Sequence, residues 1–254
     1  PTFAHKRANQ IFANWISIFY GYPTFAWIPT HNLNHHKFVN KAGDATITWR
    51  YTNSHNSLVA VTYFFVSAYW KSEPINQFIS KAKLSKGSQF KRIITQYVIW
   101  AGAHLGMLGL AIALHGGWEG LYVWGLSMGL PAFFALWTIM LFNYEQHVHT
   151  DPFSEYDHSR SFTSPILNFL LFNNGYHLVH HDKPGAHWSQ LAELHREVED
   201  KIHPSLVQKS IWWYWFKQYA LAPFIPSMGT IQLGAGPMNP PGEEGVDIST
   251  ADVA

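Results

Sequence analysis

Two long stretches of the chain are apolar throughout and lie close together in the sequence. Residues 93–114 and 121–142 each contain 22 residues without an Asp, Glu, Lys or Arg. A helix of about 20 apolar residues crosses the hydrocarbon core of a bilayer, so each stretch is long enough to span one. Only HGGWEG, residues 115–120, separates them. The pattern predicts a transmembrane helical hairpin, with a pair of buried helices in a soluble protein as the alternative.

Two other apolar stretches are shorter or interrupted. Residues 57–70 form a run of 14, which suits an interfacial or re-entrant helix better than a span. Residues 11–29 contain Pro23 and Pro29, and the sequence leaves open whether they form a short span or lie in the interface. From residue 226 onward the chain is rich in Gly and Pro. We therefore expect a membrane domain over residues 1–225 and a poorly ordered tail over 226–254.

The distribution of charge predicts an orientation for the hairpin. Residues 71–92 contain six Lys or Arg and one acidic residue, whereas residues 115–120 contain no basic residue. Because cytoplasmic loops carry an excess of Lys and Arg, residues 71–92 are expected on the cytoplasmic side. The hairpin then returns the chain to that side after residue 142.

The composition limits the chemistry that the chain can perform. There is no Cys, so thiolate metal sites and iron–sulfur clusters are excluded, and any metal needs nitrogen or oxygen ligands. The formal net charge of +1 gives no indication of a nucleic-acid partner. No GxGxxG motif is present, so electrons for any redox reaction must come from another protein.

Histidines gather in three short segments, one of which directly follows the second apolar stretch. HNLNHH begins at residue 31, NYEQH at 143 and HLVHH at 177. Side chains at i, i+3 and i+4 share one face of a helix, so these imidazoles can converge. We expect His31 and His35 to face one metal ion and His36 to turn toward a neighbouring ion. A nitrogen-rich site of this kind suits iron, copper, nickel or zinc.

The order HxxxHH, NxxxH and HxxHH, over roughly residues 1–205, resembles the membrane fatty acid desaturase and hydroxylase superfamily. NNGYHLVHHDKPGAHW is similar to the third histidine box of bacterial acyl-lipid desaturases, and the other two segments also resemble boxes of membrane alkane hydroxylases. The resemblance implies an all-α, integral membrane helical bundle with a cytoplasmic, histidine-rich di-iron cap. It also implies a set of metal ligands: His31, His35, His36, Asn143, His147, His177, His180 and His181. In some members of the superfamily, the residue at the position of Asn143 reaches iron through a water molecule.

The resemblance also implies an activity and its partners. It implies a di-iron oxidoreductase that uses dioxygen to introduce a double bond into a fatty acyl or similar hydrocarbon chain. Electrons would come from a ferredoxin, or from a cytochrome with its reductase. Residues 71–92 are a candidate docking face for that donor, or a segment attracted to anionic lipid. Alternatives on the same site are an alkane or carotenoid hydroxylase and an alkene-forming fatty acid decarboxylase; a membrane zinc hydrolase is a further alternative.

Some expectations concern residues outside the three boxes. The superfamily has a further histidine box of the HxxxH type, which we expect upstream of Pro1. The alternative is that His5 replaces the ligands of that box. His104 lies within an apolar stretch and is either functional or a packing residue with one hydrogen bond. Carboxylates near the boxes are candidate partners of the ligating imidazoles: Asp44, Glu145, Asp151, Asp157 and Asp182. Four histidines are predicted to lie at the surface: His55, His115, His195 and His203.

Overall fold

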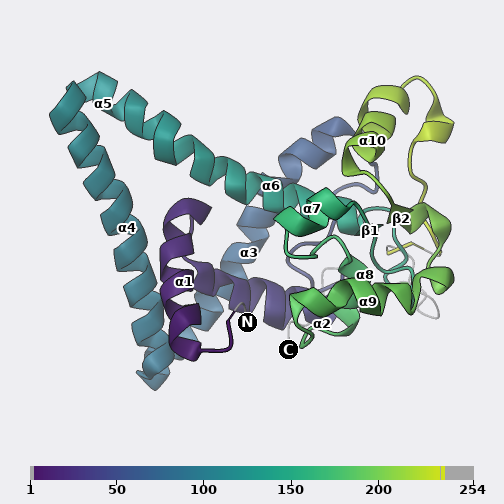
Figure 1. The fold of residues 1–254 in the computed structure, drawn as a ribbon, viewed down its shortest axis with the longest axis horizontal. Coiled ribbons are helices and arrows are strands. Elements are labelled where there is room, and N and C mark those ends of the chain that lie inside the picture. Colours follow the sequence, from purple (N-terminus) through teal and green to yellow (C-terminus); the bar gives the residue numbers. More distant parts are fainter. Residues whose placement is uncertain (1–2, 235, 238–254) are drawn as a thin grey trace. The chain divides into compact units, whose positions relative to one another are not determined.

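The computed structural model describes residues 3–234, 236 and 237, and these residues are mostly helical (Figure 1). Within the described part of the chain, the strands are β1 (Ser161–Phe162) and β2 (Val207–Gln208), which pair in parallel. The predicted helical fold is therefore confirmed. The chain divides into two compact units. We call Pro1–Leu33 with Ala68–Met140 the hairpin unit, and Asn34–Ser67 with Leu141–Ala254 the histidine unit.

The predicted helical hairpin is present, and its turn is tighter than expected. The segments are α4 (Ser88–His115), α5 (Gly117–Trp124), the π-helix η3 (Gly125–Gly129) and α6 (Leu130–His147). Gly116 alone breaks the helix, at a φ of 89°, in the left-handed region that favours glycine. Gly120 lets the two arms approach, because a Cβ there would lie 2.4 Å from Ile112 Cα. Most of the predicted loop is thus the first turn of the second arm.

Both arms of the hairpin are long and apolar enough to cross a membrane. The two arms are Ser88–His115 and Gly117–His147. In the most apolar 18-residue segment of each arm, 6% and 22%, respectively, is buried inside the protein. A core helix of a soluble protein would bury most of such a segment. The exposure of so many apolar side chains therefore disfavours the soluble alternative.

The N-terminal part of the hairpin unit packs against α4. Helix α1 (Lys6–Tyr20) ends at Gly21, and the short helix η1 (Thr24–Ala26) follows. Phe25 is fully buried in a cluster with Ala82 and Ile93, and its backbone N–H donates to Gln96 Oε1 over 2.7 Å. Residues 11–29 are therefore interrupted by a turn, as their prolines indicated.

Helix α3 (Ser57–Ser85) is much longer than its apolar part. The sequence predicted an apolar helix over residues 57–70, but the helix has 29 residues and continues through Pro74 and the first lysines of the basic segment. The helix continues because Ile75, Phe78, Ile79 and Ala82, at positions i, i+3, i+4 and i+7, form an apolar face that packs in the cluster around Phe25. Residues up to 67 belong to the histidine unit and the rest to the hairpin unit.

The histidine unit consists of short helices around two apolar clusters. One cluster contains Phe142, Phe162, Ile211 and Tyr214, and the other contains Leu178, Ile202 and Leu206. The short helices are α2 (His36–Phe38), α7 (Pro165–Leu170), α8 (His177–Asp182), η4 (Trp188–Gln190), α9 (Leu191–Arg196), η5 (Glu199–Lys201), η6 (Pro204–Leu206), α10 (Ile211–Trp215), η7 (Phe216–Leu221) and η8 (Pro226–Met228).

The first residues of the expected tail are held against the histidine unit. The Thr230 hydroxyl lies 2.7 Å from His55 Nδ1, and Gln232 Nε2 donates to the Thr150 carbonyl over 2.6 Å. The domain boundary at residue 225 stays a prediction, and residues 238–254 lie outside the described residues.

Candidate metal centre

Three separate segments bring four histidines of the histidine unit to one place. His35 is the last residue of the π-helix η2 (Ile28–His35), and His147 is the last residue of α6. His177 and His181 lie one turn apart on α8. Gly175 makes the entry to α8 possible, because a Cβ at this position would lie 2.3 Å from the Phe162 carbonyl oxygen.

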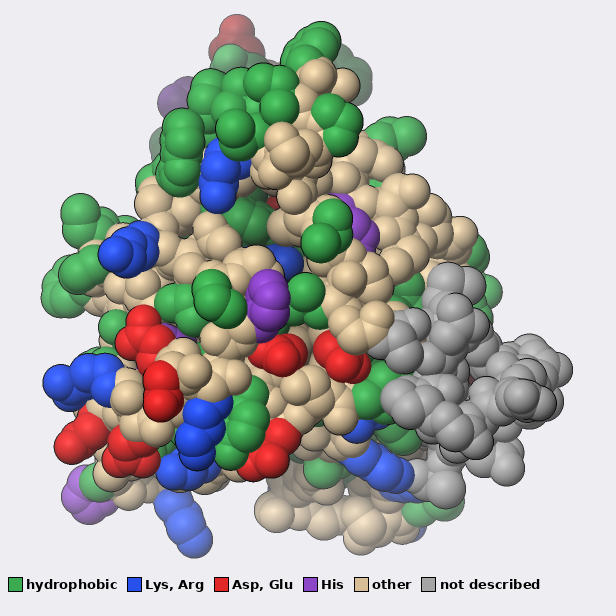
Figure 2. Space-filling view, turned by 90° about the vertical axis from the view of Figure 1, so that its right-hand side faces the viewer, with side chains coloured by type: hydrophobic (Ala, Val, Ile, Leu, Met, Phe, Trp, Pro, Cys, Tyr) green, Lys and Arg blue, Asp and Glu red, His purple; other side chains and the backbone are tan. Residues whose placement is uncertain are grey.

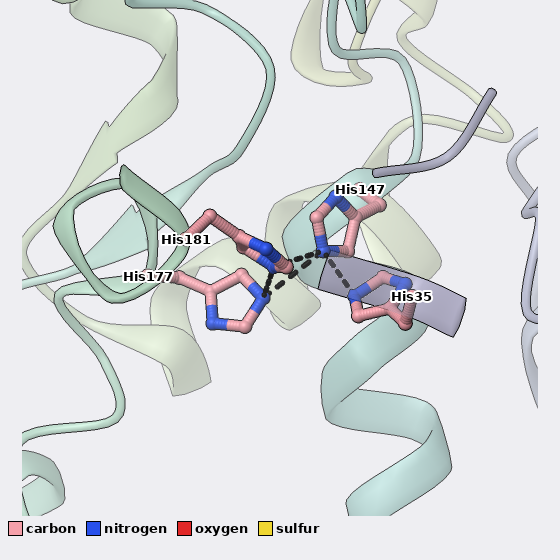
Figure 3. A group of neighbouring side chains, drawn as sticks. All are labelled: His35, His147, His177 and His181. Atoms are coloured by element: carbon pink, nitrogen blue, oxygen red, sulfur yellow. Dashed lines mark hydrogen bonds between the residues drawn. The ribbon is translucent and has the colours of Figure 1, made fainter. Parts of the chain in front are cut away.

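The four imidazoles are turned toward one another through their Nε2 atoms (Figure 3). His147 Nε2 lies 3.1 Å from that of His35, 3.0 Å from that of His177 and 3.2 Å from that of His181. The Nε2 atoms of His177 and His181 are 3.1 Å apart. All four residues are buried, with exposed fractions between 0% and 8%. This is a closed, nitrogen-only set of ligand atoms.

The hydrogen bonds on the far side of two rings indicate what the centre can hold. His35 Nδ1 lies 2.7 Å from Asp44 Oδ2, and His147 Nδ1 lies 3.3 Å from the His158 carbonyl oxygen. A carboxylate and a carbonyl only accept, so each neutral ring carries its proton on Nδ1. Two Nε2 lone pairs then face each other, which is unfavourable unless a cation lies between them. Metal-ligating histidines show this same outer pairing. The residues present therefore fit a metal ion.

Burial keeps the ligand nitrogens available for a metal. The pKa of His147 and that of His181 lie well below the usual histidine value, first because burial penalises the charged ring and then because of neighbouring imidazoles. Burial alone would raise the pKa of Asp44, but His35 and hydrogen bonds from His35 and Thr46 outweigh it and lower this pKa to about 2. Asp44 is thus ionised and His147 and His181 are neutral at physiological pH.

A second pair of imidazoles lies beside the first four. The ring centroids of His36 and His180 are 4.8 Å apart, and His36 is 4.5 Å from His181. Burial, followed by neighbouring histidines, lowers the pKa of His36 and that of His180 to about 4. His36 thus contacts His180 and His181, whereas His35 contacts His147 and His181, and the assignment of His36 to a neighbouring ion stays a prediction.

His31 lies in the hairpin unit, where its ring meets Trp27 edge-on at 4.8 Å. It belongs to the π-helix η2, whose backbone hydrogen bonds join residues i and i+5, so its residues do not follow the α-helical repeat. The expectation that His31 and His35 face the same ion assumed α-helical spacing, so that assumption was wrong. His31 as a ligand stays a prediction.

Asn143 is held in one orientation by Tyr63. The Tyr63 hydroxyl donates to the Thr46 carbonyl over 2.5 Å, so its oxygen can only accept from Asn143 Nδ2, 2.9 Å away. This assigns the amide: Nδ2 faces Tyr63, and Oδ1 points away from it. Thr46 Oγ1 also lies 3.0 Å from His35 Nδ1, so Thr46 contacts one candidate ligand and, through Tyr63, orients another.

The structure corrects several assignments of residues around the boxes. His55 and His195 were predicted to lie at the surface but are buried, whereas His115 and His203 are exposed as expected. His55 Nε2 lies 3.2 Å from Glu145 Oε2 and 3.0 Å from the Tyr219 hydroxyl. No hydrophobic pattern marks the segment around His55, so its burial was not visible in the sequence.

The remaining carboxylates and histidines have defined contacts. Asp44 contacts a candidate ligand directly, and Asp182 contacts His158 over 3.0 Å. In the hairpin unit, His104 Nε2 lies 2.9 Å from the Ile18 carbonyl, which corresponds to the packing alternative, and His5 is exposed. Asp151 and Asp157 accept from backbone N–H groups of Phe153 and His203.

The chain is mostly helical, with two helices that could span a membrane and a buried set of converging imidazoles that could hold a metal ion. The sequence model of one protein family, described as Fatty acid desaturase, matches residues 2–216. The chain therefore belongs to the fatty acid desaturase family. No curated protein matches the chain, and no solved structure does. Membership makes the protein an oxidoreductase with a lipid or acyl substrate, in a family that typically uses iron.

Proposed function

We propose that the protein is a di-iron oxidoreductase that uses dioxygen to introduce a double bond into a fatty acyl or similar long hydrocarbon chain. The observation that carries the proposal is the convergence of four buried Nε2 atoms, with neighbouring atoms 3.0–3.2 Å apart. The family supplies the reaction class, and the donor set supports a metal that accepts imidazole ligands.

The residues are proposed to act as follows. His35, His147, His177 and His181 hold one iron, and His36 and His180 belong to the other. The family resemblance adds His31 and Asn143, the latter through its Oδ1 and a water molecule. Asp44 keeps the His35 proton on Nδ1 and so keeps Nε2 free for the metal.

Bound iron would supply an oxidising power that no side chain has, as the removal of hydrogen from an unactivated methylene requires. Reducing dioxygen to water takes four electrons, and forming one carbon–carbon double bond releases two. The other two must come from an external donor, for which we propose a ferredoxin, or a cytochrome with its reductase. The basic segment over residues 71–92 is the proposed docking face.

We place the protein in a membrane, with α4 and the α5–α6 arm as the spans. The excess of Lys and Arg over residues 71–92 supports an orientation in which the metal site faces the cytoplasm. The acyl chain would reach the site from the bilayer.

The experiment that tests the proposal combines metal analysis with product analysis. The purified protein is examined for iron and zinc by mass spectrometry, then incubated with a donor system, dioxygen and a fatty acyl substrate. We expect iron and a product two hydrogens lighter than the substrate. A hydroxylated product, or an alkene one carbon shorter, supports the alternatives on the same site. Zinc without iron contradicts the oxygenase proposal.

A further inference from the structure

Helix α7 has apolar side chains on its outer face as well as its inner face. Ser164 caps the helix by accepting from Leu167 N–H, and Pro165 opens it. Leu167 packs inward against the cluster around Phe142, whereas Ile166 is 75% and Phe169 84% exposed. A surface helix of a soluble protein turns polar residues outward. The outer face of α7 therefore requires an apolar or interfacial environment.

Helix α10 shows the same arrangement. Ser210 caps it by accepting from the Trp213 N–H over 3.2 Å, and Ile211 and Tyr214 are buried. Trp212 is 73% and Trp213 55% exposed on the other side. Lys209 and Lys217 flank the helix, so cations stand at both ends of a tryptophan-rich face. Tryptophan and flanking lysines are enriched where a protein meets lipid headgroups.

Both helices pack on the same buried cluster, and that cluster contains Phe142 of α6. Phe142 is the last residue of the second apolar stretch, five positions before His147. Helices α7 and α10 therefore lie beside the point where the candidate span gives way to the polar histidine segment. That is the level at which a bilayer surface would lie.

The charge pattern separates this surface from the rest of the unit. Residues 161–181 contain no Asp, Glu, Lys or Arg, whereas α9 and η5 expose several. Figure 2 shows acidic and basic side chains gathered in the lower part of one face, at the level of α9 in Figure 1. Hydrophobic side chains predominate in its upper part, at the level of α10. An electron-carrier protein would need a charged docking rim, so a lipid surface is the better match for α7 and α10.

An open hollow lies beside α7. Its volume is about 630 Å³, and its lining includes Phe169, Phe172, Tyr176 and Trp188. Phe172 and Trp188 meet edge-on at 5.4 Å. Such an aromatic, shallow hollow can receive the upper part of a lipid acyl chain.

From these observations we infer that α7 and α10, with Phe172 and Trp188, form an interfacial surface that inserts shallowly into the lipid bilayer. This surface would hold the histidine unit against the membrane, independently of the spans. The inference rests on the proposed insertion of the hairpin, and the experiment below tests the two separately.

The chain lacks Cys, so single-cysteine variants can be labelled at one defined position. Phe169→Cys and Trp212→Cys report on the proposed surface. Leu110→Cys, exposed on α4, is the control for a position in the proposed span. Asp200→Cys, exposed on η5, is the control for a position in contact with water. Each variant carries an environment-sensitive fluorophore and is reconstituted into phosphatidylcholine vesicles. Lipids with a nitroxide near the headgroup or near the chain end quench from the bilayer, and iodide quenches from water.

We expect labels at 169 and 212 to be quenched most by the headgroup-proximal nitroxide, and the label at 110 by the nitroxide at the chain end. The label at 200 should respond to iodide. If 110 is quenched by lipid while 169 and 212 behave like 200, the interfacial surface is wrong although the hairpin inserts. If 169 and 212 are shielded from both quenchers, a protein covers them and the inference is overturned. If 110 itself responds to iodide alone, the proposed insertion fails.

Discussion

Replacing Asp44 by Asn tests whether the metal centre depends on the position of the His35 proton. The carboxylate accepts from His35 Nδ1 at 2.7 Å, Asn40 N at 2.9 Å, and Thr46 N and Oγ1 at 2.7 Å. Both of its oxygens therefore face donors. An asparagine must turn its –NH₂ group toward one of these donor pairs. Turned toward His35, the amide donates to Nδ1, so the proton moves to Nε2 and the ring loses its lone pair for the metal.

The expected magnitude follows from two features of Asp44. Loss of an outer partner of a ligating histidine weakens metal binding by about 10–100-fold, or about 1.4–2.7 kcal/mol. The folded-state pKa of about 2, against 3.8, corresponds to about 2 kcal/mol that favours the ionised carboxylate in the folded protein. Because this pKa is lowered, the contribution is complete above the unfolded value and is lost as the pH falls toward the folded value. At neutral pH the Asn variant lacks all of it.

The assay is a competition titration of the metal-free Asp44→Asn protein against a chromophoric chelator, with thermal unfolding measured alongside. Glu145→Gln is the matched control, because Glu145 is equally buried and pairs with His55 rather than with a candidate ligand. We expect the control to lose stability but keep its metal affinity. Native metal affinity in Asp44→Asn would refute the argument that Asp44 fixes the His35 tautomer.

Three further predictions concern the other residues of the site. His147→Ala should lose iron and turnover while the helical circular dichroism remains; iron retained at the native level would remove His147 from the ligand set. Tyr63→Phe frees the Asn143 amide to rotate, so it should lower turnover while iron is retained. Adding Asn143→Ala to this variant should cause little further loss of turnover. Additive losses in the double variant would show that Tyr63 does not act through Asn143. The pKa values of His36 and His180 lie near 4, below the unfolded value of 6.5, so the metal-free protein should lose stability as the pH falls from 6.5 toward 4; unfolding temperatures that stay constant over this range would contradict this.

The sequence predicted the elements that depend on periodicity and spacing. The hairpin was readable because charged residues are absent from residues 93–114 and 121–142, and four of the eight predicted ligands converge in one set. The continuation of α3 beyond residue 70 was missed because the uninterrupted apolar stretch ends there, although Ile75, Phe78, Ile79 and Ala82 recur at helical spacing and pack around Phe25. Side-chain spacing cannot reveal a π-helix, and so it misplaced His31 relative to His35.

The outer contacts of the site were only partly predictable. Asp44 was one of five candidate carboxylates, and only the folded loop selects it. The partner of His147 is a backbone carbonyl, which every residue carries and which no sequence motif marks. The burial of His55 follows from contacts with Tyr219 and Thr230, far along the chain. Long-range contacts of this kind leave no local pattern.

We propose that four buried imidazoles hold iron, those of His35, His147, His177 and His181. X-ray absorption at the iron edge of the purified protein tests it most directly, with metal content measured on the same sample. We expect about two iron ions per complete protein and a first coordination shell in which the multiple scattering of imidazole rings is prominent. In His177→Ala this imidazole contribution should fall together with the iron content. Zinc in place of iron, or iron without an imidazole signature, would show that these histidines do not hold iron.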